Sequence, residues 1–64
     1  MAQKRRFALG ADVRIIMPGM NGVVVKCDDE PSVLGEYWHT VRTEKYGEKR
    51  EPGSNLELIP KASI

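Results

Sequence analysis

Glycine and proline residues punctuate this chain about every ten positions, and that spacing constrains its fold more than any other feature. The segments between them are too short for an α-helix, and their apolar residues alternate with a period of two. Short strands at this spacing are typical of an all-β sandwich or barrel. We predict one all-β domain, a small five-stranded barrel, because closure removes exposed strand edges at minimum length. The turn residues are Gly19, Gly22, Pro31, Gly35, Gly47, Pro52 and Gly53.

The strands are predicted over about 12–16, 22–28, 36–43, 48–51 and 56–59, with a loop over about 28–35. Val13 and Ile15 share one face of the first strand, and Leu56 and Leu58 share one face of the last. The fourth strand is almost entirely charged, which suits an exposed strand protected against edge pairing. Before the last strand, a turn over 52–55 has room for a single 3₁₀ turn.

Two strands bear most directly on function. In the second strand, we expect Val23, Val25 and Cys27 on one face and Val24 and Lys26 on the other, with both faces partly covered. In the third strand, two alternating sets compete for the core. Val41 favours burial of the first set and Trp38 favours burial of the second; the sets are Tyr37, His39, Val41 and Thr43 against Trp38, Thr40 and Arg42.

The small size of the chain limits what can hold it together. It has 64 residues, one cysteine (Cys27) and one histidine (His39), so no intrachain disulfide can form. Those two side chains cannot complete a four-ligand zinc site either, and we expect no metal or cofactor. A single core of this size supplies only about 3–5 kcal/mol of net stability. This favours either a well-packed barrel or a homo-oligomer.

The charge pattern indicates neither a membrane segment nor a strongly basic protein. Ten Lys and Arg balance nine Asp and Glu, so the net charge alone does not indicate nucleic acid or membrane. No apolar stretch approaches the roughly 20 residues of a membrane span. The basic N-terminus is not followed by the apolar region of a secretory signal, and we expect a cytoplasmic protein with a reduced thiol. The expected layout is a basic tail over 1–6, the barrel over 7–60 and a C-terminal tail over 61–64.

A family resemblance extends over most of the chain. Phe7, Gly10, Asp12–Val13 and Ile15, followed by Gly19, Gly22 and Val24, resemble the opening of small Src-homology-3-like barrels of the KOW and Tudor kinds. The closing phrase 55–60 (NLELIP) is similar to the last strand of many short bacterial and phage proteins of this build. The resemblance implies a Src-homology-3-like barrel over residues 7–60 and says little about activity.

A narrower resemblance links the chain to the plasmid-borne type II dihydrofolate reductases, which are short tetrameric barrels. It rests on residues 35–37 (GEY) and on 52–54 (PGS) before a strand that ends at Pro60. The active-site strand of that family carries Val–Gln–Ile–Tyr, where this chain has 55–59 (NLELI). Its substrate-steering lysine would fall near Ile15 and Ile16. The resemblance therefore implies fold kinship, and a reductase is the most remote alternative.

No catalytic constellation is recognisable. His39 has no Ser-His-Asp or Cys-His spacing around it, so we interpret it as a half-buried strand histidine. Cys27 ends an apolar face beside Asp28, Asp29 and Glu30. These acids disfavour a reactive thiolate, so core packing is the expected role. The acidic run itself lacks the spacing of an EF-hand and is expected to be a solvated loop. We predict a protein without enzymatic activity; the one alternative is a catalytic site shared between subunits at a symmetry axis.

The remaining candidates form a binding surface. Basic residues near exposed aromatic rings suit nucleic acid, because the cations contact phosphates and the rings stack on bases. The opposing interpretation places Trp38 in the core, with the tyrosines covering the barrel ends and the charges scattered. The candidate surface is Lys4, Arg5, Arg6, Arg14, Tyr37, Trp38, Arg42 and Tyr46.

Two functions follow from these features. The first is a binding module for nucleic acid or a nucleoprotein partner, based on the basic N-terminus and the aromatics of the third strand. The alternative is a protein-interaction or self-assembling module, because the core is small and no disulfide or metal stabilises it. Copies of the chain could then share Val23, Val25, Tyr37 or Trp38 at a two-fold interface.

Overall fold

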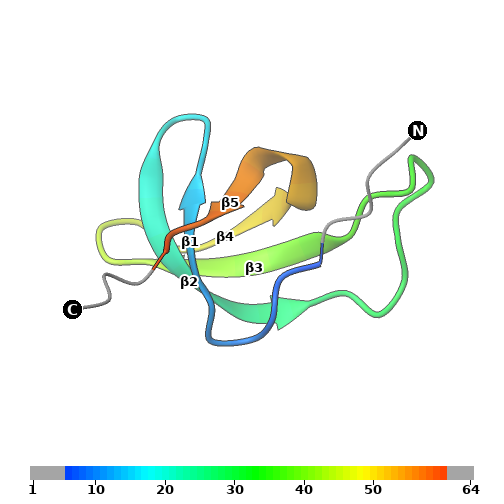
Figure 1. Cartoon of the computed structure of the whole chain (residues 1–64), viewed down its shortest axis with the longest axis horizontal. Coiled ribbons are helices and arrows are strands. Elements are labelled where there is room, and N and C mark those ends of the chain that lie inside the picture. Colours follow the sequence, from blue (N-terminus) through cyan, green and yellow to red (C-terminus); the bar gives the residue numbers. More distant parts are fainter. Residues whose placement is uncertain (1–5, 61–64) are drawn as a thin grey trace.

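Five antiparallel strands form one sheet in the computed structural model, which describes residues 6–60 (Figure 1). The order across the sheet is β4-β3-β2-β1-β5. A single 3₁₀ turn, η1, precedes the last strand, so the predicted all-β fold with five strands is confirmed. The elements are β1 (Asp12–Ile15), β2 (Met20–Cys27), β3 (Trp38–Thr43), β4 (Gly47–Pro52), η1 (Gly53–Asn55) and β5 (Leu56–Leu58). Lys4, Arg5 and the predicted tail over 61–64 lie outside the described residues.

The strand bounds differ most from prediction at the starts of β2 and β3. β2 begins at Met20, and β3 begins at Trp38 rather than two residues earlier. The reason is local, because Ser32 and Glu36 bond to each other in the loop instead of joining the sheet. The connection therefore spans 28–37. Within residues 6–60, no helix is long and apolar enough to cross a membrane.

The core is small and lies between the two arms of the bent sheet. Five apolar side chains are fully buried, with Phe7, Ala11 and Met20 packed against them. These five are Val13, Ile15, Val24, Val41 and Leu56. Leu56 is buried as predicted, but its predicted face partner Leu58 is 60% exposed, since β5 ends there and the chain leaves the sheet.

The buried face of β3 is that of His39, Val41 and Thr43, which decides the alternative left open by the sequence. Trp38 lies on the other face and does not belong to the core, where one interpretation had placed it.

The predicted faces of β2 were wrong in part. A bulge between Val24 and Lys26 inserts Val25 and shifts the alternation. Val23 therefore pairs with Arg42 on the outer face, whereas Cys27 pairs with His39 on the inner face.

Candidate binding groove

Cross-strand register places a row of outward side chains across four strands. Asp12 of β1 is opposite Val23 of β2, and Val23 is opposite Arg42 of β3. Arg42 in turn faces Glu48 of β4. Opposed residues in antiparallel strands share a face, so these side chains lie side by side on the outer surface. Arg14, two residues beyond Asp12 on β1, joins the same face.

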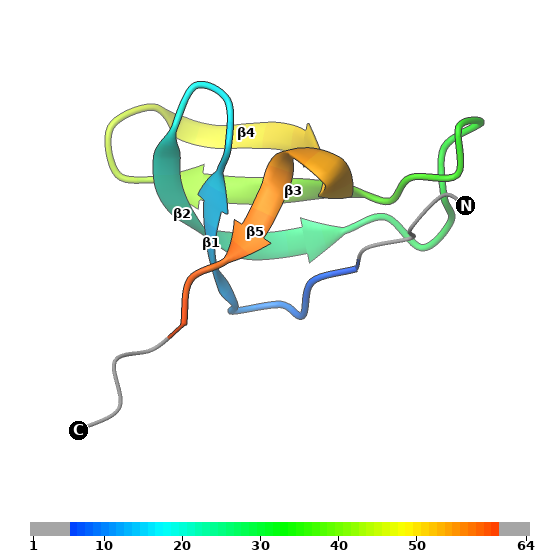
Figure 2. The same cartoon turned by 45° about the horizontal axis from the view of Figure 1, so that its top comes forward.

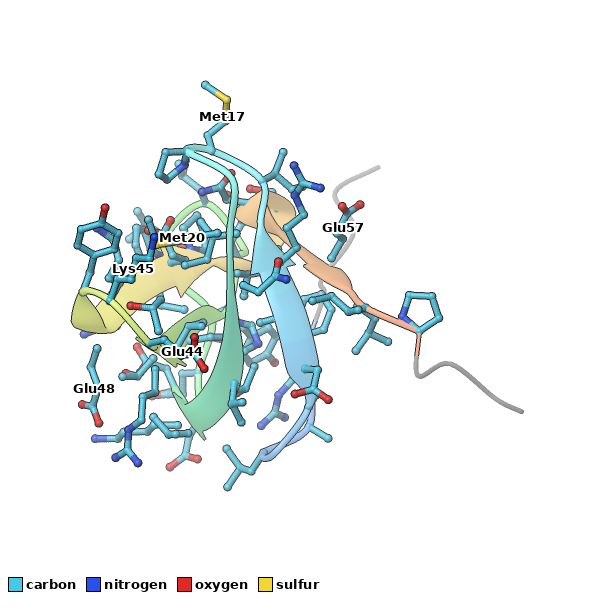
Figure 3. The ribbon with its side chains drawn as sticks, turned by 90° about the vertical axis from the view of Figure 1, so that its left-hand side faces the viewer. Met17, Met20, Glu44, Lys45, Glu48 and Glu57 are labelled. Carbon is cyan, nitrogen blue, oxygen red and sulfur yellow. The ribbon has the colours of Figure 1, made fainter. Side chains whose placement is uncertain are left out.

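A groove of about 970 Å³ is lined by Asp12, Arg14, Val23 and Arg42 of this row. We call it the turn groove, because the β1–β2 turn and the β3–β4 turn line it, together with the chain that leaves β5. Figure 3 views this end of the molecule, with Met17 pointing away at the tip of the β1–β2 turn and Glu44 and Lys45 in the β3–β4 turn. Its charged and aromatic lining residues are Arg14, Arg42, Lys45 and Tyr46, with the acids Asp12 and Glu44.

Gly22 allows the close strand approach beneath the groove. A Cβ atom at this position would lie 2.6 Å from both the Arg42 carbonyl oxygen and the Val41 Cγ1. Real contacts are never so short, so any side chain here would push β2 away from β3. From the sequence we predicted Gly22 to be a turn residue, but it lies inside β2, where it allows the close contact with β3.

The β3–β4 turn holds Tyr46 at the rim of the groove. The Tyr46 amide donates to the Thr43 Oγ1 at 3.1 Å, and the Thr43 hydroxyl donates to the Gly47 carbonyl at 2.9 Å. The backbone of the turn is therefore fixed, while the tyrosine residue remains 64% exposed. Lys49 Nζ lies 5.9 Å from the ring centroid, at the outer limit of a cation–π contact.

The two arginines of the groove differ in their partners. Arg42 Nη2 lies 3.1 Å from Glu48 Oε2, in a pair whose side chains are 65% and 51% exposed. Such a surface pair contributes little and can exchange for another anion. Within residues 6–60, Arg14 has no ion pair. Lys45, which the sequence analysis had not singled out, adds a third cation, against the acids Asp12 and Glu44.

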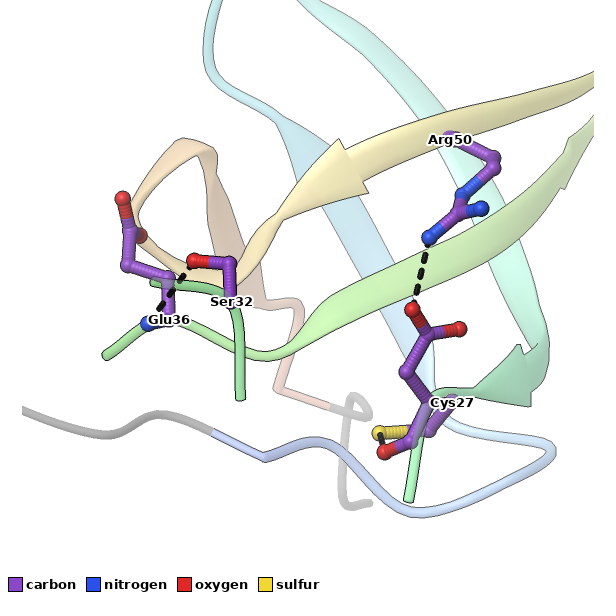
Figure 4. Close-up of polar contacts among 5 residues, drawn as sticks. Cys27, Ser32, Glu36 and Arg50 are labelled. Carbon is purple, nitrogen blue, oxygen red and sulfur yellow. Dashed lines mark hydrogen bonds and ion pairs between the residues drawn. The ribbon is translucent and has the colours of Figure 1, made fainter. Parts of the chain in front are cut away.

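Three other predicted residues, Arg6, Tyr37 and Trp38, lie elsewhere, and Arg50 contacts one of them; we call these four residues the aromatic end. The Arg6 guanidinium lies 4.7 Å from the Tyr37 ring centroid, and that of Arg50 lies 5.8 Å from the Trp38 ring centroid. Arg50 also pairs with Asp28 at 2.7 Å (Figure 4). Both rings thus carry a cation from the chain itself.

Arg50 is the aromatic-end residue that the sequence analysis missed. It was placed correctly on the charged fourth strand, but nothing in that strand indicated its partner. Arg50 pairs across the sheet with Thr40, two residues from Trp38 on the same face. Knowledge of the cross-strand register would have placed Arg50 near Trp38. Arg42 lies four residues from Trp38, or about 13 Å along β3, so Arg14 and Arg42 do not flank the indole.

His39 is fully buried rather than half-buried, which corrects the sequence expectation. Its Nε2 accepts a hydrogen bond from the Phe7 amide at 3.0 Å, and the two rings meet edge to face at 5.3 Å. Within residues 6–60, its Nδ1 has no hydrogen-bond partner. Burial lowers the pKa of His39, because it penalises the charged imidazolium. The histidine therefore ties the N-terminal segment to the core.

Cys27 is partly buried, and its thiol donates to the Asp28 carbonyl at 3.5 Å (Figure 4). Among residues 6–60, no three His, Cys, Asp or Glu side chains are grouped so as to hold a metal ion. Comparisons with known proteins find no matching family model, no matching curated protein and no matching solved structure.

Proposed function

We propose that this protein is a non-enzymatic binding module that holds single-stranded nucleic acid in the turn groove. One observation carries the proposal: Arg14 of β1, Arg42 of β3 and the exposed Tyr46 of the β3–β4 turn line the same groove. Three of the eight residues expected from sequence thus come together there, whereas Arg6, Tyr37 and Trp38 lie at the aromatic end.

The chemistry of the groove suits a single strand better than a duplex. An exposed tyrosine ring stacks on an unpaired base, and each such contact is worth about 1–3 kcal/mol. Arginine and lysine side chains contact the phosphates that follow along the strand. Asp12 and Glu44 offset two of the three cations, so we expect modest affinity. With three phosphate contacts, the logarithm of the affinity should fall with the logarithm of salt at a slope of about −2.

We also infer that the sheet belongs to a Src-homology-3-like barrel. The strand order β4-β3-β2-β1-β5, the strong bend at the β2 bulge and the 3₁₀ turn before β5 support this inference.

The test is fluorescence anisotropy of labelled single-stranded and duplex oligonucleotides at two salt concentrations. Tyr46→Ala should weaken single-strand binding on the order of tenfold through lost stacking. Arg14→Gln should reduce the salt slope by about 0.7, the share of one phosphate contact.

Arg50→Gln is the matched control, because it removes one charge at the aromatic end. It should change binding less than Arg14→Gln does. Equal losses from the two variants would mean dispersed attraction rather than a groove, and no binding at low salt would exclude the function.

A second candidate, self-association, is favoured by a different observation. Val33 and Leu34 lie at the tip of the 28–37 connection and are almost completely exposed, at 102% and 80%. Apolar side chains displayed in this way are typical of contacts with another protein.

A further inference from the structure

The connection between β2 and β3, residues 28–37, extends away from the sheet. Figures 1 and 2 both place it at one end of the molecule and the β3–β4 turn at the other. It contains the acids Asp28, Asp29, Glu30 and Glu36 and no lysine or arginine. We call this segment the acidic loop.

The tip of the acidic loop has a defined conformation. The Gly35 amide donates to the Ser32 carbonyl at 2.8 Å, which closes a β-turn with Val33 and Leu34 at its centre. The Ser32 amide donates to the Glu36 carbonyl at 2.6 Å, and the Glu36 amide donates to the Ser32 Oγ at 3.4 Å (Figure 4). Because these bonds hold the turn, a partner would lose little entropy in ordering it.

The turn groove complements this tip in charge and in character. Three cations and two acids line it, and since Arg42 pairs with the neighbouring Glu48, Arg14 and Lys45 are its cations without an ion pair among residues 6–60; the acidic loop carries acids alone. Apolar surface lines the groove as well, from Met20, Val23 and Ile59. Two apolar side chains can therefore enter the groove while acids of the loop approach Arg14 and Lys45 at its edge.

We propose that the Val33–Leu34 tip of one copy docks in the turn groove of a second copy. Tip and groove lie at opposite ends of the molecule, so a tip cannot reach the groove of its own copy. Repeating the contact between copies gives a head-to-tail chain or ring, and two antiparallel copies that exchange tips give a two-fold dimer. This inference goes beyond nucleic-acid binding and does not depend on it, although both ligands would compete for Arg14 and Tyr46.

Sedimentation of the full chain without nucleic acid tests the proposal. The contact is small, so association should appear on the order of 0.1–1 mM protein. The double substitution Val33→Ser with Leu34→Ser removes the apolar tip, and Arg14→Glu places a repelling charge in the groove. Each variant alone should be monomeric. Leu9→Ser, which changes a leucine that is 66% exposed and lies outside both surfaces, should associate as the original chain does.

Mixing the tip variant with the groove variant gives the sharpest result. The tip variant keeps an intact groove and the groove variant keeps an intact tip, so one functional contact remains between them. The mixture should form one-to-one dimers and nothing larger. Unchanged melting temperatures would show that each variant is folded.

Three results would overturn the proposal: a chain that stays monomeric at about 1 mM, a tip variant that associates like the original, or a mixture that stays monomeric or exceeds dimers.

Discussion

The turn groove and the aromatic end lie at opposite ends of the same sheet, and both contain arginines and aromatic rings. They differ in how many contacts these arginines and rings make with other side chains of the same molecule. At the aromatic end, Arg6 lies on Tyr37, and Arg50 lies on Trp38 while it pairs with Asp28. At the groove, Arg14 has no ion pair within residues 6–60, Arg42 pairs only with the exposed Glu48, and Tyr46 is 64% exposed although Lys49 Nζ lies 5.9 Å from its ring. A cluster of the right residue types is therefore a better candidate for a ligand where its groups remain exposed and a cation lacks an ion pair.

The two ends also differ in what builds them. The groove depends on a close backbone approach at Gly22 and on the clamped β1–β2 turn. The aromatic end depends on contacts between side chains, such as those of Arg50 with Trp38 and Asp28. Substitutions of the residues that support the groove, Gly22 and Asn55, should therefore cost more stability than removal of a charge at the aromatic end.

The largest expected effect is that of Gly22→Ala. The new Cβ would meet the Arg42 carbonyl oxygen and Val41 Cγ1 at 2.6 Å, and neither belongs to a flexible side chain. We expect a loss of about 3 kcal/mol in the free energy of unfolding. Urea denaturation followed by Trp38 fluorescence measures it.

Gly35→Ala is the matched control for this substitution. Nothing lies within 4 Å of a Cβ at Gly35, so only its positive φ of 84° is penalised. We expect about 1 kcal/mol from the left-handed backbone conformation. A Gly22→Ala loss no larger than the Gly35→Ala loss would contradict the close approach beneath the groove.

Asn55→Ala should have the next largest effect. Its Oδ1 accepts from the Met17 amide at 3.0 Å, and its Nδ2 donates to the Met17 carbonyl and to Glu51 Oε1, both at 2.9 Å. These bonds fasten the β1–β2 turn to η1, so their loss should cost about 2 kcal/mol. Amide hydrogen exchange at Met17 should also accelerate. An unchanged Met17 exchange rate would mean that the turn does not need this clamp.

The pH dependence of stability tests His39. Its pKa is lowered in the folded state from 6.5, mainly by burial, so the unfolded chain binds more protons just below pH 6.5. Stability is therefore fully present above that pH and falls as the pH drops toward the folded-state pKa, by at most about 1.4 kcal/mol per pH unit. Urea midpoints at several pH values measure this slope.

Neighbouring charges act on His39 in opposite directions, because Arg6 lowers its pKa and Asp28 raises it, and Glu51 is its neighbour on β4. His39→Gln serves as the control, since its amide can accept from the Phe7 amide but does not titrate. Hydrogen bonds from Ser54 also lower the pKa of Glu36, but this group changes the stability only at pH values below 4.5. If His39→Gln keeps the full slope between pH 5 and 6.5, His39 is not its source.

The smallest expected effect is a difference in stability between loss of the Arg50–Asp28 pair and loss of the Arg42–Glu48 pair. Arg50→Gln removes both an ion pair and a cation–π contact, whereas Arg42→Gln removes only an exposed ion pair. We expect about 1 kcal/mol for the first and about 0.3 kcal/mol for the second. Arg50→Gln should also shift Trp38 emission. Equal losses with no change in emission would argue against the contact of Arg50 with the indole.

The amino-acid sequence by itself determined the all-β class, the five strands and most of the core. Period-two alternation and turn residues act within a few positions, so they predict local structure well. Val13, Ile15 and Leu56 are buried as that pattern indicates, and the charged fourth strand lies at the edge of the sheet.

Only the tertiary structure decided which face of β3 is buried and which predicted site residues meet. The bulge at Val25 moves Val23 to the outer face beside Arg42, and cross-strand register brings Arg50 near Trp38. Arg14, Arg42 and Tyr46 line one groove because two turns and the close approach at Gly22 gather them. Register between strands depends on contacts far apart in the chain, and no local pattern encodes those contacts.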